Sequence, residues 1–251
     1  MKMWTRLLRW LRAWGGVLLT LVGGCRGDER PRIPPKPNAV VVDRTARAQK
    51  EPRRYAALGA SDTQAEGAGS LREGYVFRLF DRLAAQGGSW ELYILGWGGA
   101  RLSDILRWQL PAALAVRPEV ITLWTGGNDV IKGVAPEEFA ADLDRLLRTL
   151  RTETRAHLVL ANLPEMHRQP FAAGKSAQER AQLQERVKAF NALIERVAAR
   201  YRVPVVDLTA GELMYDPANF SPDGIHPNAQ GYAGIAARFW QVLEQEMSDR
   251  D

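Results

Sequence analysis

The sequence has few of the side chains that hold metals or form cross-links. Cys25 is the only cysteine in 251 residues, so no disulfide can form within the chain. There are three histidines, and no cysteine or carboxylate cluster accompanies them at the spacing of zinc ligands. We therefore expect no bound metal, and we interpret His157 and His167 as structural or solvent-facing side chains.

The beginning of the chain lacks an apolar run long enough to span a membrane comfortably. Residues 1–14 contain four basic side chains, residues 15–22 are uncharged, and residues 23–25 read Gly-Gly-Cys. This order is typical of a secretory signal, and its end resembles a bacterial lipobox, in which the cysteine is lipidated and becomes the mature N-terminus. We expect residues 1–24 to be a lipoprotein signal peptide, and the protein to be exported and lipid-anchored through Cys25 to the outer face of a bacterial membrane. The alternative is an ordinary signal, or an uncleaved anchor, with an incidental cysteine.

Residues 25–54 lack a sustained apolar pattern and are rich in proline and charge, so we interpret them as a semi-extended tether. The first 54 residues carry 13 Lys and Arg against 4 Asp and Glu, whereas the rest of the chain carries 21 against 25. The folded part therefore lacks the basic excess that nucleic-acid binding requires, and we expect no nucleic-acid partner.

Residues 55–251 are of single-domain size and alternate between short apolar runs and helical patterns. The apolar runs predict strands at 55–59, 91–95, 120–124, 157–160 and 203–208. Amphipathic spacing predicts helices at 71–85, from 103 until Pro111 interferes, from 136 through 150, at 176–200 and from 229 onwards. This alternation predicts an α/β fold with a parallel sheet covered by helices on both faces.

A candidate nucleophile follows the first strand, where Gly59 allows a sharp turn that delivers Ser61 at the carboxyl edge of the sheet. Alone, such a serine is more simply explained as a turn or helix-capping residue. Three further stretches follow later strands or lie in the last loop: Leu95-Gly96-Trp97-Gly98-Gly99-Ala100, Thr125-Gly126-Gly127-Asn128-Asp129 and Ser221-Pro222-Asp223-Gly224-Ile225-His226-Pro227-Asn228. In this order the four stretches resemble the blocks of the SGNH hydrolases, the GDSL-like esterases and lipases, from about residue 55 to the end of the chain.

The resemblance implies a three-layer α/β/α, flavodoxin-like sandwich with a parallel sheet of about five strands. It also implies that Ser61 is the nucleophile, that His226 is the general base and then the acid, and that Asp223 orients the imidazole. Asp223 and His226 lie three residues apart in one proline-flanked loop, so the carboxylate can reach the ring nitrogen that faces away from the serine.

The same resemblance places the oxyanion donors on the backbone N–H of Ser61, the backbone N–H of Gly99 and the side-chain amide of Asn128. Gly98 is an alternative to Gly99, because the two glycines are adjacent. The chain departs from the family pattern at Ala60, where an aspartate is usual.

Several neighbouring residues have more than one interpretation. Asp62 has no assigned role. Trp97 and Trp124 either line a substrate pocket or belong to the core. Asp129 is expected to brace the loop of Asn128. An α/β-hydrolase would have glycine where Thr63 stands, and its acidic residue and histidine would be far apart in the sequence.

We therefore expect a serine esterase without metal or organic cofactor, acting through an acyl-enzyme on short acyl or acetyl esters of envelope or environmental substrates. The alternatives are a lysophospholipase or thioesterase of the same family and a non-catalytic, glycan-binding lipoprotein. Acyl-chain length and oligomeric state are not determined by the sequence.

Overall fold

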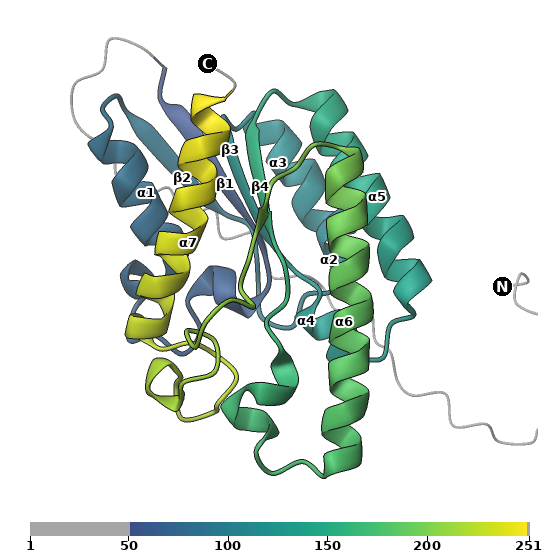
Figure 1. Ribbon diagram of the computed structural model, residues 1–251. Coiled ribbons are helices and arrows are strands. Elements are labelled where there is room, and N and C mark those ends of the chain that lie inside the picture. The colour runs from purple at the N-terminus through teal and green to yellow at the C-terminus, as the bar shows by residue number, and fades with distance from the viewer. Residues whose placement is uncertain (1–50, 250–251) are drawn as a thin grey trace, which may run out of the picture. The chain divides into compact units, whose positions relative to one another are not determined.

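Five parallel strands form one sheet, as the strand pattern predicted, and their order is β2-β1-β3-β4-β5 (Figure 1). The computed structural model describes residues 51–249, so the predicted signal, Cys25 and the tether as far as residue 50 lie outside the described residues. The strands are β1 (Arg53–Gly59), β2 (Trp90–Ile94), β3 (Val120–Trp124), β4 (His157–Ala161) and β5 (Val205–Val206).

Helices cover both faces of the sheet and make it the middle of three layers (Figure 1). Helices α1 and α7 pack on one face, and the segment from α2 to α3 packs with α5 and α6 on the other. Their bounds are α1 (Tyr75–Ala85), α2 (Leu102–Asp104), the π-helical turn η3 (Ile105–Gln109), α3 (Leu110–Val116), α4 (Gly127–Ile131), α5 (Pro136–Glu153), α6 (Ala177–Arg200) and α7 (Ala229–Ser248). The fold is thus the predicted three-layer α/β/α sandwich, with a flavodoxin-like strand order.

Strand β1 occupies an interior position in the sheet, and its side chains enter both cores. Tyr55 and Ala57 belong to the core under α1 and α7, whereas Ala56 and Leu58 belong to the core on the opposite face. All four are fully buried, which explains the uninterrupted apolar run in the sequence.

Four elements differ from the sequence-based expectation. The helix from residue 103 does not end at Pro111 but continues to Val116, because the π-helical turn precedes a new helix in which the proline occupies the first turn and needs no N–H. Helix α1 begins at Tyr75, after a separate 3-10 turn at Leu71–Glu73. Strand β5 is only two residues long, and β1 starts two residues before the expected domain boundary.

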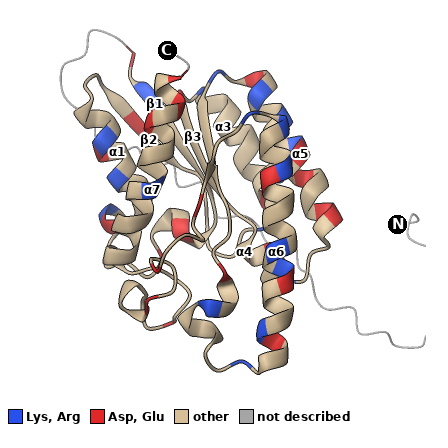
Figure 2. Ribbon diagram, viewed as in Figure 1, with Lys and Arg blue, Asp and Glu red and all other residues tan. Residues whose placement is uncertain are grey.

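Charged residues are distributed over the helices, where Lys and Arg are interspersed with Asp and Glu (Figure 2). Within residues 51–249, no helix combines the length and the apolar character needed to cross a membrane.

A buried glutamine holds the turn that ends β1. The Gly59 N–H donates to Gln109 Oε1 at 2.9 Å, and Gln109 Nε2 donates to the Gly59 carbonyl at 2.8 Å. A side chain at position 59 would meet Thr63 Oγ1 at 2.4 Å and the Trp124 carbonyl at 2.5 Å, so only glycine fits. Gln109 therefore binds both the N–H and the carbonyl of Gly59, two residues before Ser61.

Replacing this glutamine is expected to destabilise the fold. Gln109→Leu leaves two buried backbone groups without their partner, so the free energy of unfolding should fall by about 2–4 kcal/mol, measured by urea denaturation. The exposed Gln241→Leu serves as the matched control and should change it by less than about 0.5 kcal/mol. Equal stability of the two variants would contradict the role assigned to Gln109.

Candidate active site

Loops at the carboxyl edge of the sheet bring together the polar residues that the sequence singled out. Ser61 begins the 3-10 turn η1 (Ser61–Gln64) directly after β1, and Asn128 lies in α4 after β3. Asp223 and His226 lie in the loop before α7, which Asn228 fixes by capping that helix and by donating to two carbonyls of the preceding turn. The parallel topology therefore places residues distant in sequence at one edge.

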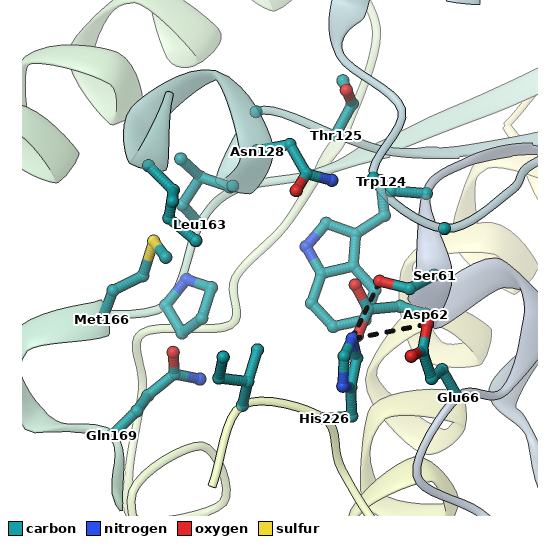
Figure 3. A pocket seen from close by; sticks show the side chains of 18 of the residues that line it. Ser61, Asp62, Glu66, Trp124, Thr125, Asn128, Leu163, Met166, Gln169 and His226 are labelled. Carbon is teal, nitrogen blue, oxygen red and sulfur yellow. Dashed lines mark hydrogen bonds and ion pairs between the residues drawn. The ribbon is translucent and has the colours of Figure 1, made fainter. Parts of the chain in front are cut away.

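Ser61, His226 and Asp223 form one hydrogen-bonded chain. Ser61 Oγ lies 2.9 Å from His226 Nε2, and His226 Nδ1 lies 2.6 Å from Asp223 Oδ2. The second oxygen of Asp223 accepts the backbone N–H groups of Ile225 and His226 and the hydroxyl of Ser221. The carboxylate is thus held on one side by its own loop and on the other by the imidazole (Figure 3 shows the Ser61–His226 pair).

The surrounding carboxylates favour a charged imidazole. Partial burial acts to lower the pKa of His226, but the hydrogen bond to Asp223 and the charges of Asp62, Glu66 and Asp223 raise that pKa above its ordinary value. Although burial acts to raise the pKa of Asp223, its hydrogen bonds outweigh that effect and hold the pKa well below the usual range. Glu66 Oε2 lies 3.8 Å from His226 Nε2, on the side that faces the serine.

Asp62 is a further ionisable group beside the candidate nucleophile, and it lines a cavity together with Ser61 and His226. Its removal from solvent raises its pKa to about 6, against the lowering effect of His226. Its charge therefore changes in the same pH range in which imidazole titrates.

Two of the predicted oxyanion donors, Gly99 and Asn128, line the cavity that Ser61 also lines. The Gly98 N–H donates to Gln64 Oε1 at 3.1 Å, whereas the Gly99 N–H donates to no other group among residues 51–249. The Asn128 amide uses one N–H on the Ala100 carbonyl at 3.0 Å, which leaves the other free to bind a ligand. This arrangement favours Gly99 over Gly98 as the backbone donor.

Two contacts position these donors. Asp129 is buried and accepts the Leu102 N–H with both oxygens at 3.2 Å, and burial raises its pKa to about 6. Lys132 Nζ donates to the Gly99 carbonyl at 2.7 Å. The sequence suggested a bracing role for Asp129, but it gave no indication of Lys132, which lies outside every motif.

A cavity of about 340 Å³ opens beside Ser61 and has a largely apolar lining. Trp124 lines it and also packs edge-on against Tyr75, whereas Trp97 is not part of its wall. The other apolar lining residues are Ala60, Ile131, Leu163, Pro164, Met166, Met214 and Ile225. Most of these residues lie in loops after β3, β4 and β5, and their position after strands is the signal that could have identified them.

The described part of the chain offers no obvious metal site, because no three His, Cys, Asp or Glu side chains gather as ligands within residues 51–249. His157 begins β4, and His167 lines a separate cavity.

The sequence of this chain is similar to those of known proteins. The model of the GDSL-like lipase/acylhydrolase family matches residues 57–233. "Thioesterase 1/protease 1/lysophospholipase L1" of Escherichia coli (strain K12) is 26% identical over 129 residues, 51% of this chain and 55% of the relative, so the match spans about half of that protein. "Esterase TesA" of Pseudomonas aeruginosa is 25% identical over 174 residues, 68% of this chain and 79% of the relative.

A solved structure with the same fold is Axe2, an acetylxylan esterase from Geobacillus stearothermophilus. The TM-score is 0.62 at 18% sequence identity, and the alignment covers 76% of this chain and 94% of that one. At this identity the likeness shows a shared fold.

Removing the charge of Glu66 is expected to lower the pKa of His226, because a carboxylate near Nε2 stabilises the imidazolium. The pKa can be followed by NMR titration of the three imidazole resonances in the wild type and in Glu66→Gln. Glu244→Gln, near the far end of α7, is the matched control and should leave it unchanged. An unaltered His226 pKa in Glu66→Gln would show that solvent screens this pair completely.

Proposed function

Because this chain belongs to the GDSL-like lipase/acylhydrolase family, we propose that it is a serine hydrolase that cleaves carboxylic esters through an acyl-enzyme intermediate. The observation that carries the proposal is the hydrogen-bonded chain Ser61–His226–Asp223 at the wall of an apolar cavity. A hydroxyl is a weak nucleophile until a base takes its proton, and His226 lies within hydrogen-bond distance to do so.

In the first half of the proposed reaction, Ser61 Oγ bonds to the ester carbonyl carbon as its proton passes to His226 Nε2. Asp223 holds the Nδ1–H tautomer and stabilises the imidazolium. The oxyanion is bound by the N–H groups of Ser61 and Gly99 and by the Asn128 amide, each donor contributing about 3 kcal/mol. The carbon–oxygen bond to the alcohol then breaks, and His226 returns the proton to the departing oxygen.

The second half reverses these roles with water as the nucleophile. His226 takes a proton from water, the hydroxide bonds to the acyl carbon, and the bond to Ser61 Oγ breaks. The proton on His226 returns to Ser61, and the carboxylic acid is released. No atom other than those of water and ester is consumed.

We place the substrate among short acyl or acetyl esters of envelope or environmental molecules. A cavity of about 340 Å³ is near the lower limit of ligand pockets, and its largely apolar lining suits a short acyl group. A lysophospholipase or thioesterase is the second candidate, because the Escherichia coli relative bears those names and because Ile131 and Ile225 expose apolar surface at this cavity. A non-catalytic glycan-binding protein is less well supported, since binding alone would not require the complete chain of Ser61, His226 and Asp223.

We also propose that the protein is exported and anchored through a lipid on Cys25. The basic residues 1–14, the short uncharged stretch and the Gly-Gly-Cys sequence support this location. The basic tether would then lie close to anionic headgroups.

The esterase mechanism predicts a graded loss of activity. Ser61→Ala should lower kcat by about 10⁴-fold or more, and Asn128→Ala by about 10²- to 10³-fold, because the first removes the nucleophile and the second one oxyanion donor. Turnover is measured on p-nitrophenyl esters from acetate to long chains, where the short chains should react fastest.

Ser248→Ala, at the end of α7, is the matched control and should retain full activity. A wild-type protein that is folded but neither hydrolyses any ester nor reacts with a phosphonate probe would reject the esterase proposal and favour the binding protein.

The lipid anchor predicts a change of cell fraction. In a bacterial host, the wild type should enter the membrane fraction and incorporate labelled fatty acid, whereas Cys25→Ala should do neither, because it lacks the thiol that carries the lipid. Equal labelling of the two proteins would overturn this assignment.

A further inference from the structure

Gln169 is a polar side chain in an otherwise apolar part of the cavity wall. It is only 5% exposed, it lines the cavity, and its amide points into it (Figure 3). Its backbone is fixed by a hydrogen bond from its N–H to the Met166 carbonyl and by another that its carbonyl accepts from the Ala172 N–H. The side-chain amide, in contrast, has no hydrogen-bond partner within residues 51–249.

The Gln169 amide faces the cavity and binds no group of the described protein, so its hydrogen bonds depend on water or on a ligand in that cavity. The great majority of buried side-chain polar groups therefore bind another group of the protein, an ordered water or a ligand. In Gln169 the free donors and acceptor face the substrate cavity, so a bound ligand can satisfy them.

The place of Gln169 indicates which part of the ester it would meet. Ser61 and Gln169 lie on opposite sides of the cavity, with Leu163 and Met166 on the side of Gln169 (Figure 3). Leu163, Met166 and Gln169 are each 5% exposed or less, whereas the Glu66 side chain beside His226 is 54% exposed. The enclosed side suits the acyl group, which stays bound after the alcohol has left through the open side.

We propose that Gln169 is a specificity-determining residue that hydrogen-bonds an oxygen carried on the acyl chain. The preferred substrates are esters whose acyl group crosses the apolar part of the cavity and bears a keto or hydroxyl oxygen on its far side. This inference rests on the proposed esterase function of the same cavity and narrows its substrate class. An amide both donates and accepts, so it can bind either oxygen.

The test compares matched p-nitrophenyl esters that share one leaving group. One ester of each pair has an unsubstituted acyl chain of five to seven carbons, and the other carries a keto group near the end of the same chain. The full-length wild type should favour the keto ester in kcat/KM by about tenfold for at least one chain length, because a site built around a polar group discriminates against a substrate that leaves it unpaired.

Gln169→Met keeps the length and approximate volume of the side chain and removes the hydrogen bond. It should abolish the preference for the keto ester while it retains or increases turnover of the unsubstituted one. The exposed Gln178→Met is the matched control and should keep the wild-type preference. Thermal unfolding of both variants verifies that they are folded.

The possible outcomes distinguish failure of the role proposed for Gln169 from failure of the proposed esterase function. Hydrolysis that depends on Ser61 but shows no keto preference in the wild type rejects the role of Gln169 and leaves the esterase intact. A preference for the keto ester that persists in Gln169→Met also rejects it. Absence of hydrolysis with every ester rejects the esterase function itself.

Discussion

The hydrogen bond between His226 and Asp223 is the interaction on which the candidate site depends. It decides which imidazole nitrogen carries the proton, and so it leaves Nε2 able to accept from Ser61. The loop around Asp223 is built to keep this carboxylate charged, because two backbone N–H groups and the Ser221 hydroxyl all donate to one of its oxygens. A protonated Asp223 would accept these hydrogen bonds less strongly than the carboxylate does. The geometry of the loop and the orientation of the imidazole therefore support each other.

The sheet supplies the second constraint, since it fixes where the loops begin. Parallel strands end at one edge, and β1 and β3 pair in register so that Gly59 lies opposite Trp124. The backbone between β1 and Ser61 is consequently confined between the Trp124 carbonyl and the buried Gln109. The position of the Ser61 backbone is therefore determined by the sheet and by the helical segment that carries Gln109. The last loop determines only the contact between Ser61 and His226.

The sequence predicted the parts of the molecule in which local pattern and tertiary position coincide. The fully buried run Tyr55–Leu58 identified an interior parallel strand, and motif order identified the residues that now lie beside Ser61. It could not reveal that a π-helical turn would precede Pro111 and place the proline in the first turn of α3. The sequence also does not show the tertiary contact between Gln109 and Gly59 that this turn carries. The sequence also gave no indication of Gln169 and Lys132. Only the fold brings Gln169 to the cavity wall and Lys132 to the Gly99 carbonyl.

The cavity and the charges around His226 impose opposite demands on the same small space. In the proposed reaction, Asp62 and Glu66 would stabilise the imidazolium that forms when Ser61 loses its proton, but a higher His226 pKa also leaves less neutral base at a given pH. Glu66 lies at the solvent-exposed edge, whereas Gln169, Leu163 and Met166 are buried. The charged side of the cavity is therefore separated in space from its apolar side. In the proposed reaction, charge would be concentrated where the proton moves, and the enclosed wall would offer only neutral groups to the acyl chain.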